Sequence, residues 1–121
     1  MAQATVNLSE EAEEWLVGLE PRERGPAVTV LRMLERMGVT LPAPWSSALE
    51  GTKYPLRELR PQQGRSPLRI FYGFDSKREA YVMAGGDKAK DKRLYQRIIP
   101  KLERMWDEHQ REIQEEDDNN S

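Results

Sequence analysis

Cationic side chains between residues 60 and 90 have the chemistry and the spacing to bind a phosphate group. Arg60 is expected to end one strand and Arg69 to begin the next, while Lys88 and Lys90 follow a third strand. Short connections between antiparallel strands would bring these four residues to one edge of a sheet. The sequence therefore predicts a phosphate-sized cluster of cations at that edge.

Aromatic side chains near these cations could stack on the bases of a single-stranded nucleic acid; they are Tyr72, Tyr81 and Tyr95. Alternatively, each ring packs in the core and keeps only its hydroxyl in water. Some arginines also have an ordinary alternative, an exposed position or an ion pair with Glu58 or Asp75; these are Arg57, Arg65 and Arg78.

The charge of the chain is sorted by position. Residues 1–52 carry four Lys/Arg against eight Asp/Glu, residues 53–104 carry fourteen against six, and residues 105–121 carry one against seven. The formal net charge of -2 thus averages a basic body and two acidic ends. Within the basic body, cations alternate with aromatic and β-branched residues in strand-like segments. This pattern favours a polyanion partner such as RNA over a merely solvated surface.

Two amphipathic helices are expected in the first third of the chain, after a short strand at 4–7. Ser9 is a suitable N-cap, followed by acidic residues in the first helical turn and by an apolar face that runs to Leu19. After breaks at Pro21 and Gly25-Pro26, a second helix is expected from Ala27 to Met37, and Gly38 can end it. The two helices should form a hairpin, followed by a loop at 41–45 in which Trp45 can anchor the core.

After Gly51 the hydrophobic period shifts toward two. Residues 56–60, 68–74 and 79–85 are expected to form strands, and their short connections favour an antiparallel meander. Large side chains on both sides of the middle strand predict that it is covered on both faces. We expect one face of the sheet to pack on the helices and the other to be concave.

A helical pattern resumes at Asp91, and Pro100 should kink this helix or begin a new one. Residues 114–121 are polar and acidic, so we expect them to be disordered and dispensable for folding. The predicted fold class is α+β: a helical hairpin on a small antiparallel sheet, then a C-terminal helix. A single domain would span residues 1–113, and residues 114–121 would form the tail.

Residue types exclude several classes of site. The chain has no cysteine and one histidine, His109, so disulfides, thiolate sites, zinc clusters and histidine triads are ruled out. Neither a membrane-length apolar run nor a secretory signal is visible. We expect a cytoplasmic protein with no metal, no small-molecule cofactor and no membrane partner.

A series of short motifs runs from residue 49 to residue 100. In order, they are Leu49-Glu50-Gly51, Leu56-Arg57-Glu58-Leu59-Arg60, Leu68-Arg69-Ile70-Phe71-Tyr72, Gly85-Gly86-Asp87-Lys88, Leu94-Tyr95 and Ile98-Ile99-Pro100. This series resembles the RelE/ParE superfamily of toxins, over the region from Ser9 to His109. Its Gly-Gly-Asp-Lys segment is similar to the HigB-type, phage-derived branch. The resemblance implies the toxin of a type II toxin-antitoxin system with a RelE-like fold.

Many members of that superfamily cut messenger RNA on the ribosome, which implies a metal-independent endoribonuclease. The 2'-hydroxyl would be the internal nucleophile, and Arg60 and Arg69 would hold the scissile phosphate in two-pronged contacts. Lys88 would stabilise developing charge, and Tyr95 would act as acid or base. To act as a base near pH 7, Tyr95 would need neighbouring cations to lower its pKa from about 10. Further RNA contacts are expected from Arg57, Tyr72, Lys90 and Arg93.

Two features depart from that family pattern. Glu58 stands where RelE toxins place a strand lysine, and no histidine is available where HigB-type toxins often use one. Glu58 could be a general base. The flanking Arg57 and Arg60 would favour its ionised form, however, so we expect it to orient arginines.

Three functions stay open from the sequence. The first is a ribosome-associated mRNA endoribonuclease, and the second is a ParE-like inhibitor that binds DNA gyrase without chemistry. The third, suggested by the missing lysine and histidine, is a phage-derived relative that only binds RNA or protein. For a toxin we expect a cognate antitoxin, of the helix-turn-helix kind, that covers the cationic groove with an acidic or amphipathic segment.

Overall fold

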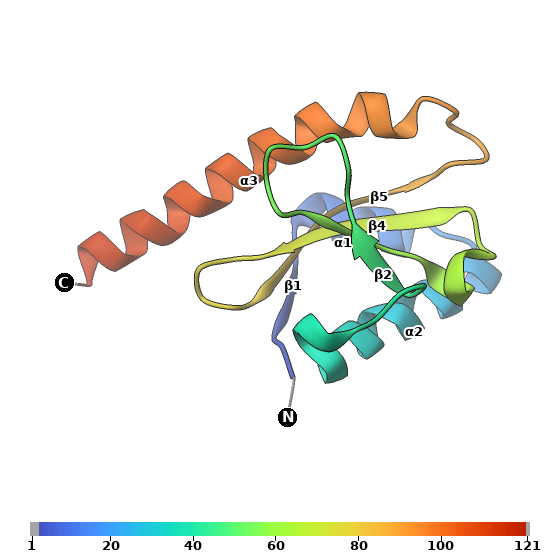
Figure 1. Cartoon of the computed structure of the whole chain (residues 1–121), viewed down its shortest axis with the longest axis horizontal. Coiled ribbons are helices and arrows are strands. Elements are labelled where there is room, and N and C mark those ends of the chain that lie inside the picture. Colours follow the sequence, from blue (N-terminus) through green and yellow to red (C-terminus); the bar gives the residue numbers. More distant parts are fainter. Residues whose placement is uncertain (1–2, 121) are drawn as a thin grey trace.

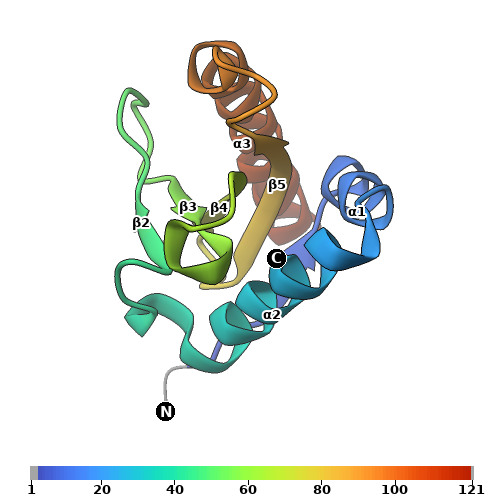
Figure 2. The same ribbon diagram turned by 90° about the vertical axis from the view of Figure 1, so that its right-hand side faces the viewer.

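The computed structural model describes residues 3–120 and has α+β architecture. A five-stranded sheet lies between two helices on one face and a long helix on the other (Figures 1 and 2). The elements, in chain order, are β1 (Val6–Leu8), α1 (Glu10–Val17), α2 (Pro21–Met37), a 3-10 turn (Gly38–Thr40), β2 (Ser46–Ala48), β3 (Arg57–Leu59), a second 3-10 turn (Pro61–Gly64), β4 (Leu68–Phe74), β5 (Ala80–Asp87) and α3 (Leu94–Asn119).

The sheet has the strand order β1-β5-β4-β3-β2. Strands β2 to β5 form an antiparallel meander, in which β3, β4 and β5 correspond to the three predicted strands. Two features differ from expectation. β1 pairs parallel with β5, which makes the sheet mixed, and β2 was not predicted because its Ser-Ser-Ala sequence has no strand-like pattern.

The first helix begins as predicted, whereas the second begins earlier. Ser9 caps α1, since its Oγ accepts a hydrogen bond from the Ala12 backbone N–H at 3.0 Å. α2 starts at Pro21, not at Ala27, because a proline is well suited to the first turn. The Arg24 side chain on this first part of α2 donates to backbone carbonyls of 16, 17 and 19, which ties it to the end of α1.

Strand β4 separates two apolar clusters, so the prediction of a central strand covered on both faces is confirmed. On the α1 and α2 side the core includes Val30, Leu34, Ile70 and Tyr72. On the other side it includes Phe71, Met83, Leu94, Ile98 and Leu102. The second face, expected to be concave, is not left open, because the apolar stripe of α3 packs on it.

α3 runs through Pro100 as one helix, so the alternative that Pro100 begins a new helix is wrong. The kink at Pro100 stays a prediction. The packing of the first two helices as a hairpin also stays a prediction. The C-terminal half of α3 is held by His109, whose Nε2 lies 2.8 Å from the buried Asp75 and whose ring stacks on Tyr81.

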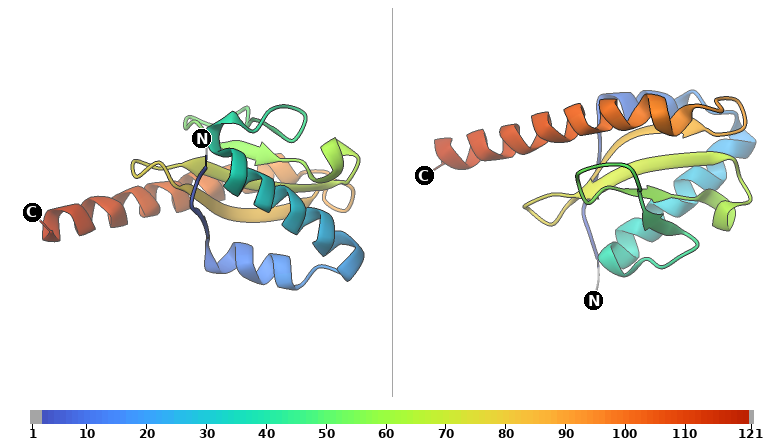
Figure 3. Two further views of the ribbon diagram at one scale, coloured as in Figure 1. Left: turned by 90° about the horizontal axis from the view of Figure 1, so that it is seen from below. Right: turned by 45° about the horizontal axis from the view of Figure 1, so that its top comes forward.

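Residues 114–119 continue this helix past the sheet instead of being disordered (Figure 3), and Ser121 lies outside the described residues. A long anchored helix favours this extension, since adding a turn costs less than starting one. None of the helices within 3–120 is long and apolar enough to cross a membrane.

Two glycine substitutions test how closely α1 approaches the sheet. A Cβ at Gly85 would lie 2.4 Å from the Trp15 ring, whereas a Cβ at Gly25 meets nothing within 4 Å. We expect Gly85→Ala to lower the free energy of unfolding by about 2 kcal/mol or more. Gly25→Ala, in the helix, should raise it by about 0.5–1 kcal/mol. Urea denaturation of both variants checks this, and equal stabilities would contradict the packing.

Removing residues 114–121 tests whether the end of α3 supports the domain. Up to residue 120, Ile113 is the last buried residue, and the Lys77–Glu116 ion pair beyond it is exposed. Because exposed ion pairs contribute at most about 1 kcal/mol, we expect the truncated protein to keep its fold and nearly its melting temperature. Circular dichroism on heating measures this, and an unfolded truncation would show that the last turns are required.

Candidate functional site

A buried carboxylate, Glu58 of β3, is the centre of the candidate site. Arg60, just after β3, places both Nε and Nη2 at 2.8 Å from Glu58 Oε2. The Tyr95 hydroxyl, from the first turn of α3, donates to Glu58 Oε1 at 2.7 Å. Arg69 of β4 brings its Nε to 3.8 Å from Oε2. Three predicted site residues from separate elements thus converge on one acid.

Strand register and a close helix approach position these side chains. Glu58 lies across from Phe71 of β4, whose ring meets the Tyr95 ring edge-on at 6.0 Å. Gly86 of β5 lies across from Arg69, and a Cβ on Gly86 would come within 2.5 Å of Leu94. Glycine there lets the start of α3 approach the sheet, so that Tyr95 can reach Glu58.

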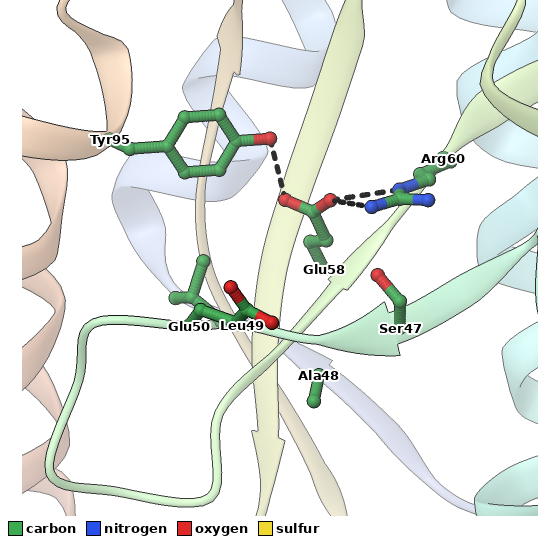
Figure 4. A pocket seen from close by; sticks show the side chains of 7 residues that line it. All are labelled: Ser47, Ala48, Leu49, Glu50, Glu58, Arg60 and Tyr95. Carbon is green, nitrogen blue, oxygen red and sulfur yellow. Dashed lines mark hydrogen bonds and ion pairs between the residues drawn. The ribbon is translucent and has the colours of Figure 1, made fainter.

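The cluster borders an open pocket of about 530 Å³, lined by Ser47, Ala48, Leu49, Glu50, Glu58, Arg60 and Tyr95. Figure 4 shows Arg60 and Tyr95 on opposite sides of the Glu58 carboxylate. The Arg60 side chain is 35% exposed, so part of its guanidinium is available to a ligand. A second pocket, about 500 Å³, shares Tyr95 and is lined by Lys88, Asp91 and Lys92. Lys88 therefore borders the neighbouring pocket.

Tyr95 does not have the lowered pKa that it would need to act as a base near pH 7. Burial, followed by the hydrogen bond to Glu58 and its negative charge, raises the pKa of Tyr95 to about 12. Arg69 acts in the opposite direction but does not outweigh these effects. The phenol is therefore protonated near pH 7, and it can accept a proton only while passing its own to another group.

Arg69 is buried behind Glu58 instead of lining the pocket. It is 5% exposed, and its Nη1 donates to the backbone carbonyls of Ser66 at 2.8 Å and Leu68 at 2.7 Å. Its Nε has no hydrogen-bond partner. The structure thus places Arg69 near the cluster, but not where an exposed phosphate ligand would be.

The four predicted RNA contacts divide into two groups. Tyr72 is 1% exposed and bonds Ser46 through its hydroxyl at 2.6 Å, so the expectation that it stacks on a base is wrong. Arg57 also bonds Ser46 and lies across from Tyr72, away from Glu58, because alternate strand residues face opposite sides. Lys90 and Arg93 are exposed beside the start of α3 and stay candidates for RNA contact.

Sequence reasoning missed the wall that β2 contributes to the pocket. Ser47 lies across from Glu58, and its hydroxyl is buried without a hydrogen-bond partner. Without a predicted β2, nothing in the sequence singled out this serine. Within residues 3–120, no group of three or more His, Asp or Glu side chains is arranged to hold a metal ion.

Solved structures show which fold this is. The chain aligns with a chain of the toxin-antitoxin complex RelBE2 from Mycobacterium tuberculosis, with a TM-score of 0.56 and 20% identity, over 74% of this chain and 95% of the other. The archaeal RelE-RelB complex from Pyrococcus horikoshii aligns with a TM-score of 0.52 and 18% identity, over 71% and 96%. The fold is therefore RelE-like.

Sequence comparison identifies the family. The model of the family described as phage derived protein Gp49-like (DUF891) matches residues 14–107, and this chain belongs to that family. It is 33% identical over 103 residues to a Mycobacterium tuberculosis protein named as a toxin, HigB2; the match covers 83% of this chain and 51% of that protein, so the chain spans about half its length. A second protein so named, HigB3, is 33% identical over 97 residues, 78% of this chain and 83% of its own. The resemblance to RelE/HigB-type toxins is confirmed.

Replacing Glu58 tests the cause of the raised Tyr95 pKa. In Glu58→Gln we expect this pKa to fall, because the negative charge is lost, yet to stay above about 10, because burial remains. Ring-carbon NMR of the tyrosines, with Tyr95→Phe for assignment, measures it. Glu50→Gln, at another acid of the pocket, is the control and should leave it unchanged. A Tyr95 that titrates below about 10 in the native protein would contradict the geometry.

Proposed function

We propose that this protein is the toxin of a type II toxin-antitoxin system and cleaves messenger RNA on the ribosome without a metal ion. Membership of the Gp49-like family and the likeness to RelE/HigB-type toxins support the toxin class. The observation that carries the chemistry is the partly exposed Arg60, held with Tyr95 on one carboxylate beside an open pocket.

The proposed reaction is a transesterification at phosphorus, with the 2'-oxygen as nucleophile and the 5'-oxygen as leaving group. In this reaction the 2'-oxygen attacks phosphorus and the bond to the 5'-oxygen breaks, which leaves a cyclic phosphate and a free 5'-hydroxyl. Arg60 would bind the non-bridging oxygens, whose negative charge increases in the transition state. An arginine suits this role because its fork of N–H donors can bind two oxygens.

Proton transfer follows from the 2.7 Å hydrogen bond between Tyr95 and Glu58. The attacking 2'-hydroxyl gives its proton to the Tyr95 oxygen while Tyr95 passes its own proton to Glu58 Oε1. This relay suits a phenol that is protonated near pH 7. Because these two oxygens are adjacent, both serve the attacking end. The 5'-oxygen takes its proton from the Lys88 ammonium group in the adjoining pocket.

A partner antitoxin is part of the proposal. The two solved relatives are described as toxin-antitoxin complexes, which supports a cognate antitoxin for this chain. A carboxylate-rich segment of it could pair with Arg60 and the exposed cations before α3, which would block the pocket by charge complementarity. The helix-turn-helix class of this antitoxin stays a prediction from the resemblance.

A second candidate is a relative that binds RNA or protein without cleavage. The burial of Arg69 favours it, since this leaves Arg60 as the arginine of the cluster with direct access to the pocket. The position of Lys88 in a neighbouring pocket favours it too. Addition of the purified protein to translating ribosomes separates the two candidates.

Purified protein added to translating ribosomes should create new message ends at codons in the decoding site. Arg60→Ala and Tyr95→Phe should each slow cleavage by about a hundredfold or more, because transition-state contacts of this kind contribute that much. Arg32→Ala, at an exposed arginine of α2 on the opposite face of the sheet, is the matched control and should cut normally. Sequencing of message ends measures the cutting.

Intact messages in the presence of folded wild-type protein would contradict the nuclease proposal. If messages stay intact but the protein traps DNA gyrase, the ParE-like alternative holds. If it binds RNA without cutting, the second candidate holds.

A further inference from the structure

Glu58 Oε2 faces two arginines that differ in access to solvent. Arg60 contacts this oxygen at 2.8 Å, and its side chain is 35% exposed. Arg69 Nε lies 3.8 Å from the same oxygen, and its side chain is 6% exposed. The exposed arginine therefore holds the close contact, while the buried one is just beyond hydrogen-bond distance.

The buried arginine is fixed and incompletely bonded. Two backbone carbonyls hold its Nη1, so the guanidinium has little freedom to move. Its Nε is buried and without a hydrogen-bond partner. An unpaired buried donor is costly, and Glu58 Oε2 is a charged acceptor 3.8 Å from this Nε. A shift of the carboxylate by about one ångström would bring the pair within hydrogen-bond distance.

A buried carboxylate also restricts what Arg60 can do. The Glu58 side chain is 4% exposed, and a charge at that depth is strongly destabilising when it loses its partner. If Arg60 were its only cation, a phosphate that drew Arg60 away would leave this charge uncompensated. A second cation behind Glu58 removes that penalty.

We infer that Arg69 is the resident counter-ion of Glu58, and that it takes over Glu58 Oε2 when Arg60 leaves to bind a phosphate. The inference rests on the proposed phosphate-binding function of the pocket. It makes Arg69 a positioning residue that acts through Glu58, in place of the direct phosphate contact expected from the sequence.

A double-mutant cycle on binding tests this hand-over without cleavage. The probe is a single-stranded oligodeoxynucleotide, which lacks the 2'-hydroxyl, with inorganic phosphate as a second probe. Arg69→Gln should weaken binding of both probes about tenfold, because Arg60 then stays on Glu58. In the Glu58→Gln background Arg60 is already free, so adding Arg69→Gln should change the affinity by less than about twofold.

The competing explanation is that Arg69 attracts the phosphate only through its positive charge, and it predicts a different result. Loss of one positive charge would then weaken binding equally in both backgrounds. Arg57→Gln is the matched control, since Arg57 faces away from Glu58, and its effect should be additive with Glu58→Gln.

The hand-over is overturned if Arg69→Gln weakens binding as much in the Glu58→Gln background as in the native one, which would make Arg69 a direct phosphate ligand. It is also overturned if Arg69→Gln has no effect, or if the native protein binds neither probe. Melting curves establish that each variant folds. If Arg69→Gln does not fold, Arg69→Lys serves instead. It keeps a positive charge beside Glu58, so affinity should stay within about threefold, whereas a tenfold loss contradicts the inference.

The binding experiment tests the hand-over, and the cleavage experiment tests the nuclease proposal, so either proposal can be refuted without the other. A protein that shows the expected cycle but leaves messages intact refutes the nuclease proposal and keeps the hand-over. A protein that cuts messages but shows no coupling between Arg69 and Glu58 refutes the hand-over and keeps the nuclease proposal.

Discussion

A carboxylate removed from water needs cations or hydrogen-bond donors around it, and the arrangement of the candidate site follows from that requirement at Glu58. The donors come from three places: Arg60 after β3, Arg69 on β4 and Tyr95 on α3. Arg60 is two residues from Glu58 in the chain, whereas Arg69 and Tyr95 come from distant segments. Glu58 thus links the pocket to the packing of α3 on the sheet, and it also raises the pKa of Tyr95.

Close packing of α3 on the sheet determines where the pocket can open. Gly86 admits Leu94 at the N-terminal end of the helix, and Gly73 admits Trp106 further along. With this second face covered, the groups suited to phosphate chemistry gather beside the start of α3. The pocket there is walled by the β2 side of the sheet (Figure 4). Tyr95 lines both this pocket and the neighbouring one, which is bordered by Lys88 and Lys92 of the β5–α3 loop.

Features set by local sequence were predictable, whereas those set by tertiary packing were not. The Ser9 cap and the strands around β4 follow from side-chain type and period, and the motif series identified the family. Tyr72 is buried on the α1 and α2 side of the sheet, and Arg69 is buried behind Glu58 on the other side. Both depend on tertiary packing, and the sequence did not show which face of the sheet α3 would cover. The orienting role of Glu58 was predicted from its neighbours in sequence, and its contact with Arg60 supports this role. The lowered pKa that Tyr95 would need to act as a base near pH 7 is not found, because burial and Glu58 outweigh Arg69.

The most direct test of the account is a crystal structure of the protein with a short oligodeoxynucleotide in the pocket. We expect a phosphate on the Arg60 guanidinium, the Tyr95 hydroxyl near the sugar that precedes it, and Glu58 paired with Arg69. A nucleotide bound on another face of the sheet, with Arg60 still on Glu58, would contradict the central role given to this carboxylate.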